Sequence, residues 1–129
     1  MNRYFNPSAL PAPGGNYSHG CEIPPGARGL MIAGQVGIKP DGTLADTIDG
    51  QCEWAFRNIL GVLEAADMRP QDITKLTTYV TDRGIGPAFA KARAKVLGEV
   101  RPPSTFLVVA GLGQPSWLIK IEATAARAP

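Results

Sequence analysis

Apolar and polar positions alternate in three stretches of the first third of the chain, which is the pattern of β-strands. We predict a short edge strand at Arg3–Phe5, a strand over Tyr17–Ile23 and a more apolar strand over Leu30–Gly37. Pro24-Pro25-Gly26 ends the second of these strands. The remainder of residues 1–16 is rich in proline and glycine and is expected to form extended chain and turns.

The pattern then changes to the helical period of 3.6 residues. Asp46 or Thr47 can cap the first free N–H groups of this helix, and Pro70 closes it at Met68-Arg69. The helix carries one wide apolar stripe, formed by Cys52, Ala55, Ile59, Val62 and Ala66 with Phe56, Leu60 and Leu63 beside them. This stripe predicts a helix packed on a core.

A β-branched and aromatic stretch over Asp72–Asp82 predicts another strand, and a second helix is expected over Pro87–Leu97 with Gly98 as its stop. On the second helix we expect an apolar side facing the sheet and a basic side facing water. The apolar side holds Phe89, Ala92, Val96 and Leu97, and the basic side holds Lys91, Arg93 and Lys95.

The last two strands, over Arg101–Leu112 and Leu118–Ala123, are joined by a Gly/Pro turn. The order of elements predicts a single α+β domain over residues 1–129, with a mixed sheet of about six strands and two helices on one face. Two helices leave the other face of the sheet uncovered. If that face is apolar, it must be buried against other subunits, so we expect an oligomer.

The composition indicates which binding partners and which cellular compartment to expect. Hydrophobic residues make up 44% and charged residues 19%, and the net charge of +2 is too small and too scattered to indicate nucleic acid. Cys21 and Cys52 have no metal-binding spacing, and we expect two reduced packing residues. The chain shows no leader and no apolar run of membrane length, so a cytoplasmic protein without a membrane partner is expected.

The sequence contains no motif typical of cofactor or metal binding, so neither a cofactor nor a metal is expected. Gly34-Gln35-Val36-Gly37 is followed by no helix and is interpreted as close strand packing rather than a phosphate loop. His19 is the only histidine, which excludes a histidine-based triad or a His-rich metal site within one chain. We interpret it as a polar strand or loop residue.

Glu122 is the strongest candidate for chemistry, because it lies between Ile121 and Ala123 in an apolar strand. Such a carboxylate is costly to bury unless something binds or uses it, and it could move protons to and from water. A structural ion pair with an arginine, or a solvent-facing edge position, would equally explain it. Tyr17 and Ser18 could present hydroxyls to a ligand or merely begin a strand.

Five segments together resemble the Rid proteins, the reactive intermediate deaminases once labelled L-PSP endoribonucleases. They are Asn16-Tyr17-Ser18-His19, Gly34-Gln35, Ala55-Phe56-Arg57-Asn58-Ile59-Leu60, Tyr79-Val80-Thr81-Asp82 and Ile119-Lys120-Ile121-Glu122-Ala123. The likeness runs from Tyr17 to nearly the end of the chain and keeps the order of elements.

The resemblance implies a chorismate-mutase-like fold and a homotrimer with its sites in clefts between subunits. Family members hydrolyse 2-imino or enamine acids to a keto acid and ammonia without a cofactor. By this resemblance Glu122 positions or activates water, and Tyr17 and the main chain around Phe106 complete the cleft. An arginine on the strand after the proline turn pairs with the substrate carboxylate.

The sequence departs from the family at that arginine, because Ser104 occupies its position. Arg93 or Arg101 could take over as the anion anchor. The site predicted from the sequence therefore consists of Glu122 and Tyr17 as catalytic residues and Ser104, Thr105, Phe106 and Arg93 as substrate-binding residues.

Two functions stay open. One is the hydrolysis of an imine, enamine or related nitrogen metabolite, and the other is a non-catalytic ligand-binding or chaperone-like trimer. The chain has no basic groove and no aromatic platform, which disfavours ribonuclease activity.

Overall fold

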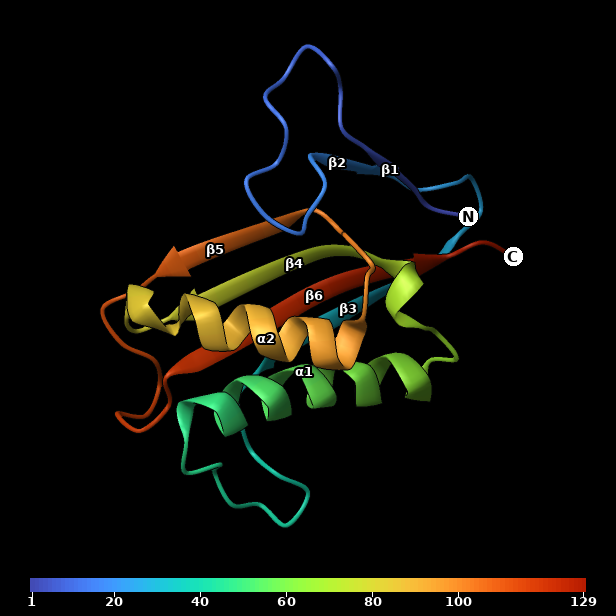
Figure 1. Cartoon of the computed structure of the whole chain (residues 1–129). Helices are drawn as coiled ribbons and strands as arrows, with labels where there is room; N and C mark the ends of the chain where they lie inside the picture. Colours follow the sequence, from blue (N-terminus) through green and yellow to red (C-terminus); the bar gives the residue numbers. More distant parts are fainter.

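The computed structural model describes residues 1–129 and places two helices on one face of a four-stranded sheet, with a two-stranded sheet beside it (Figure 1). The helices are α1 (Ile48–Ala65) and α2 (Gly86–Leu97). The large sheet holds β3 (Arg28–Gln35), β4 (Ile73–Val80), β5 (Ser104–Val108) and β6 (Ile119–Arg127). The small sheet pairs β1 (Arg3–Phe5) with β2 (Gly20–Glu22), and two 3₁₀ turns lie at Pro70–Asp72 and Arg83–Ile85.

The expected α+β class and the helices on one face are confirmed, but the single sheet of about six strands is wrong, because the strands divide into four and two. The large sheet has the order β3-β6-β4-β5, in which β4 and β5 are parallel and the other pairs are antiparallel. The last two strands therefore do not pair with each other. The helix α2 carries the chain from β4 to its parallel neighbour β5, and β6 returns antiparallel on the other side of β4.

The first helix forms as its capping residue and stripe predict. The Thr47 side chain accepts a hydrogen bond from the Gly50 N–H at 3.0 Å, so Thr47 and not Asp46 is the cap. The helix ends at Ala65, before the predicted Met68, because the chain turns through Asp67 with φ of 55°. The core lies between the helices and the sheet and includes Phe56, Ile59, Leu63, Leu76, Val80, Ile119 and Ile121.

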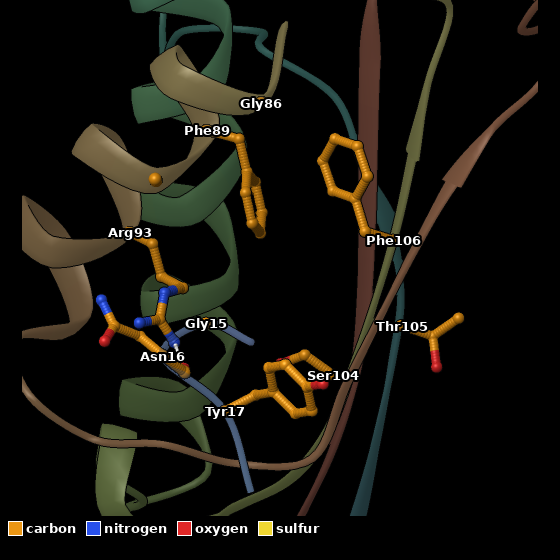
Figure 2. Close-up of a pocket in the computed structure, with 10 residues that line it drawn as sticks. Gly15, Asn16, Tyr17, Gly86, Phe89, Arg93, Ser104, Thr105 and Phe106 are labelled. Atoms are coloured by element: carbon orange, nitrogen blue, oxygen red, sulfur yellow. Dashed lines mark hydrogen bonds between the residues drawn. The ribbon is translucent and has the colours of Figure 1, made fainter. Parts of the chain in front are cut away.

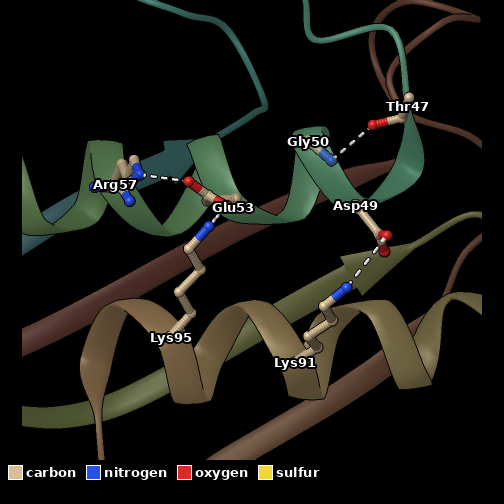
Figure 3. Close-up of polar contacts among 7 residues, drawn as sticks. All are labelled: Thr47, Asp49, Gly50, Glu53, Arg57, Lys91 and Lys95. Carbon is tan, nitrogen blue, oxygen red and sulfur yellow. Dashed lines mark hydrogen bonds and ion pairs between the residues drawn. The ribbon is translucent and has the colours of Figure 1, made fainter.

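A ladder of ion pairs joins the solvent side of the two helices (Figure 3). Lys95 donates to Glu53 at 2.7 Å, and Arg57 donates to the other oxygen of Glu53 at 2.8 Å. Lys91 lies 3.7 Å from Asp49 one turn earlier. The predicted exposure of the two lysines of α2 is thus confirmed, whereas Arg93 on the same helix is buried and its predicted exposure is wrong.

Two glycines in and just after β3 allow close packing, but only Gly34 packs against a strand as predicted, whereas Gly37 packs against α1. A Cβ on Gly34 would lie 2.5 Å from Cε of Lys120, whose stem crosses β3 at this point. A Cβ on Gly37 would lie 2.4 Å from Cα of Gln51 in the second turn of α1. Gln51 in turn holds the loop between β5 and β6, because its amide donates to the Ser116 carbonyl and accepts from the Leu118 N–H.

The uncovered face of the sheet is largely polar along its two central strands. Alternation directs Lys75, Thr77 and Tyr79 of β4 and Lys120, Glu122 and Thr124 of β6 away from the helices. Exposed apolar surface is found instead towards the two edges, with Met31 on β3 at 86% exposure. An apolar central face, the condition attached to the expected oligomer, is therefore not present in the fold.

The strand β5 forms one edge of the large sheet and is largely apolar. Phe106, Leu107 and Val108 are 38%, 43% and 48% exposed.

The two chain ends lie side by side at the opposite end of the molecule, where the Asn2 amide donates to the Ala126 carbonyl (Figure 1). Neither helix is long and apolar enough to cross a membrane.

Candidate functional site

A cavity of about 510 Å³ lies between α2, the loop that precedes β2, and the edge strand β5. Its volume falls in the range of small-molecule sites. Five of the six residues predicted for the site line it: Tyr17, Arg93, Ser104, Thr105 and Phe106. Gly15, Asn16, Gly86, Phe89 and Ala90 complete the wall (Figure 2).

The register of β5 decides which of its side chains enter this cavity. Phe106 pairs with the inward-facing Thr78 of β4, so Ser104 and Phe106 point to the helix side. Thr105 points to the other face, where its hydroxyl receives a hydrogen bond from Lys75 at 2.6 Å. Figure 2 shows the Thr105 side chain turned away from the other lining residues, so Thr105 can offer the cavity only its main chain.

Ser104 lines the same cavity as Tyr17 (Figure 2). The Ser104 hydroxyl donates to the Pro102 carbonyl at 3.1 Å. Because its hydrogen is used in this way, the oxygen lone pairs of Ser104 are left to accept a hydrogen bond from a ligand.

Arg93 lies against the loop wall with only 5% of its surface exposed. Its guanidinium donates to the Asn16 carbonyl, which ties the loop to α2 (Figure 2). No carboxylate neutralises it, since the ion pairs of the chain join other residues. Burial lowers the pKa of Arg93, and the charge of Arg101 lowers it further, although an arginine keeps its charge at any physiological pH.

Aromatic rings form the other end of the cavity. The ring of Phe89 lies 5.4 Å from that of Phe56 in the core and 5.2 Å from that of Phe106 on β5. The three rings thus run from the core to the cavity rim, and the outermost one is still 38% exposed. This end offers apolar contact and no charge.

Glu122 is the one predicted site residue that lies elsewhere. It is on the uncovered face of the sheet, at a second cavity of about 420 Å³ that Tyr79, Lys120, Gly34 and Val109 also line. The Tyr79 hydroxyl donates to Oε1 of Glu122, and this hydrogen bond raises the pKa of Tyr79. The arginine ion pair and the edge position proposed as alternatives for Glu122 are not found, because no arginine pairs with it and its strand is central. Glu122 does lie on the uncovered face of the sheet and is only half-buried.

The remaining candidates have structural roles. His19 is an exposed loop residue whose Nε2 lies 2.7 Å from the Pro11 carbonyl. Cys21 and Cys52 are both free and lie in separate elements. No group of three or more His, Cys, Asp or Glu side chains is placed to hold a metal ion.

The sequence did not predict three residues that line or contact these two cavities. Phe89 was expected in the core, and it does pack there, but its ring also reaches the cavity. Asn16 contributes a main-chain carbonyl, for which a sequence carries no signal. Tyr79 lies on the strand next to that of Glu122 and faces the same side of the sheet. Its position in the alternating pattern of β4 was the sequence signal that could have identified it.

Comparisons with known proteins agree on one relationship. The family model described as Endoribonuclease L-PSP matches residues 8–127. A RutC family protein of Pyrococcus horikoshii is 32% identical over 117 residues, which are 89% of this chain and 90% of that protein. Another, from Aquifex aeolicus, is 37% identical over 84 residues, which are 64% of this chain and 63% of that protein. The crystal structure of YyfB from Yersinia pestis, described as a protein of unknown function of the conserved Rid family, has a TM-score of 0.85 at 31% identity and covers 98% of both chains.

Proposed function

The chain belongs to the Endoribonuclease L-PSP family, the family of the Rid proteins, and from this premise we propose that it hydrolyses an imine or enamine metabolite to a carbonyl compound and ammonia. The substrate occupies the cavity between α2 and β5. One observation carries the proposal: five of the six residues chosen for this chemistry border a single cavity of suitable size, although they come from three separate elements.

The sixth residue, Glu122, is on the opposite face of the same sheet, so one chain alone does not hold a complete site. We propose that a neighbouring copy supplies its Glu122 to the cavity in a homotrimer. The exposed apolar edge at Phe106–Val108 and the exposed Met31 supply surface for such an assembly.

The chemistry assigned to the site needs no oxidant and no cofactor. A water oxygen forms the bond to the imine carbon while Glu122 accepts one of its protons. The proton then passes to the nitrogen and gives a carbinolamine. Glu122 next carries the proton of the carbinolamine hydroxyl to the same nitrogen while the carbon–nitrogen bond breaks, so that ammonia leaves as the carbonyl forms. Tyr79 holds one oxygen of Glu122, which leaves the other oxygen for water. Ser104 accepts a hydrogen bond from the substrate N–H, since its own hydrogen is bound to the Pro102 carbonyl.

Ammonia release from freshly generated 2-iminopropionate tests the reaction. We expect the wild type to accelerate release, Glu122→Gln to lose most of that acceleration, and Ser104→Arg to bind this small substrate more tightly. An active wild type with an equally active Glu122→Gln variant would show that the assigned mechanism is wrong.

The shared site is tested by complementation between two inactive variants. Ala90 is exposed on the cavity wall, so Ala90→Trp fills the cavity while leaving Glu122 intact. When Ala90→Trp and Glu122→Gln are co-expressed, some mixed sites combine an intact cavity from one chain with an intact Glu122 carboxylate from the next. Random mixing in a cyclic trimer should restore about a quarter of the sites. No recovery in mixed assemblies would refute a site shared between copies.

Ser104 favours a second function, non-catalytic ligand binding, because it gives β5 no charged anchor for a substrate carboxylate. In that case the trimer binds a small ligand in the same cavity without turning it over. Saturable binding together with an inert wild type, over several imine substrates, would select this alternative.

A further inference from the structure

Arg93 is a buried cation with no counter-charge in its own chain. It is 5% exposed, and all four ion pairs of the chain involve other residues. Its only acceptor is the Asn16 carbonyl, which carries no full charge. Burying a guanidinium without an anion is costly, so such a group at a cavity wall indicates that a ligand supplies the anion.

The surroundings of Arg93 favour a carboxylate as that anion. A guanidinium presents N–H groups in a planar fork that matches the two oxygens of a carboxylate. Asn16 engages one side of the fork and leaves the rest of it facing the cavity, where Tyr17 and Ser104 lie close by (Figure 2). No acidic residue of the same chain lines this cavity, so within one chain nothing repels an anion.

The opposite end of the same cavity is apolar. Phe89 and Phe106 face each other there with ring centroids 5.2 Å apart, and Gly86 and Ala90 of α2 leave the space beside them open (Figure 2). An exposed aromatic surface of this kind is satisfied by an apolar or aromatic group of the ligand.

Resting on the proposed binding role of this cavity, we infer that its ligands are carboxylates with an apolar or aromatic group, held by Arg93 on α2 and by the Phe89–Phe106 pair. The anchor thus comes from the helix wall and not from β5, where Ser104 stands. A ligand anchored there lies turned relative to one anchored on the strand, and its middle, where a C=N group would be, lies beside Tyr17 and Ser104.

Two stable ligands of nearly the same shape, one charged and one neutral, test the inference on the wild-type protein. Calorimetric titration with 3-phenylpropionate and with 3-phenylpropanamide compares a carboxylate with its neutral amide. We expect the carboxylate to bind at least about 30-fold more tightly, which is the lower range for losing one partner of a buried charge pair. Equal affinities would overturn the inference without any variant.

Arg93→Met then separates anchoring from a structural role of the Asn16 contact. If Arg93 anchors the carboxylate, the variant loses the preference and binds the two ligands within about 3-fold of each other. If Arg93 only holds the loop, both ligands weaken together and the preference stays. Arg93→Lys should keep part of the preference, because it keeps the charge without the fork.

Two control variants locate the charge. Lys91→Met removes a cation from the solvent side of the same helix and should leave the preference for the carboxylate unchanged. Arg101→Gln removes the exposed neighbour whose charge lowers the pKa of Arg93. A preference lost in Arg101→Gln and kept in Arg93→Met would assign the anchor to Arg101 and refute the inference.

A comparison of ligands with and without a phenyl ring tests the contact with the Phe89–Phe106 pair. Propionate should bind at least about 10-fold more weakly than 3-phenylpropionate, and Phe106→Ala should remove most of that difference. These titrations involve no turnover. An inert enzyme with the expected preferences would refute the proposed hydrolysis alone, whereas an active enzyme without them would refute only the inference about the ligand.

Discussion

Replacing Gly37 by alanine is expected to destabilise the fold by about 3 kcal/mol. The added Cβ would lie 2.4 Å from Cα of Gln51 and 2.8 Å from both its Cβ and its backbone oxygen. Carbon atoms at optimal van der Waals separation lie about 3.5–4.0 Å apart. Because two of the three atoms belong to the backbone of α1, the overlap cannot be relieved by a rotamer change, and the helix itself must move.

The expected magnitude has two sources. Overpacking of a well-packed region costs about 1–3 kcal/mol. A displaced α1 also strains the hydrogen bonds of the buried Gln51 to Ser116 and Leu118, each worth about 1 kcal/mol. For a domain of this size the melting temperature should fall by roughly 10 °C.

Urea unfolding followed by circular dichroism at one protein concentration measures this loss. Gly29→Ala is the matched control, since a Cβ at Gly29 would have no atom within 4 Å and its φ is not positive. Alanine there should leave stability unchanged or raise it by up to about 1 kcal/mol, because glycine is unfavourable in a strand. Similar unfolding midpoints for both variants would refute the packing argument.

Three further substitutions test two individual contacts. Tyr79→Phe removes the hydrogen bond to Glu122 and should lower imine turnover several-fold without weakening ligand binding, because the carboxylate that handles water is no longer held in place. Ultraviolet titration of Glu122→Gln should show one tyrosine ionising at lower pH, because Glu122 raises the pKa of Tyr79; an unchanged titration would contradict this contact. Lys95 and Arg57 hold the pKa of Glu53 below its usual value, so their stabilisation is complete above the usual glutamate pKa and is lost as pH falls through the lower folded value. Glu53→Gln should therefore cost roughly 0.5–1 kcal/mol at neutral pH and progressively less as the pH falls through the lowered pKa of Glu53, with the exposed Glu64→Gln as control; a loss that does not shrink in acid would exclude the ion pairs as its cause.

Local sequence signals predicted the parts of the fold that depend on local physics. The stripe around Phe56 and Ile59, the cap at Thr47 and the stop at Gly98 all act within a few residues, so both helices were found. Strand pairing is a long-range property. No local signal shows that β6 lies between β3 and β4, or that β2 leaves the main sheet to pair with β1.

Arg93 shows the same limit at the candidate site. Its position on the basic side of α2 predicted exposure, because Lys91 and Lys95 flank it and do face water. It is buried because Asn16, 77 residues earlier in the chain, lies over it. The site residues were chosen from the family resemblance, but their division between two faces of one sheet required the strand register. The direction of Thr105 required it as well.

The apolar edge formed by β5 affects how a single copy of the chain is expected to behave in solution. An edge strand offers unpaired backbone groups to any chain that can add a strand, and charged residues or prolines usually block this. Within β5 no such residue is present, and three of its apolar side chains are 38–48% exposed. In the proposed trimer, a substitution that separates the copies is therefore expected to cause aggregation and to yield little stable monomer, so that soluble yield would report on assembly as directly as activity does.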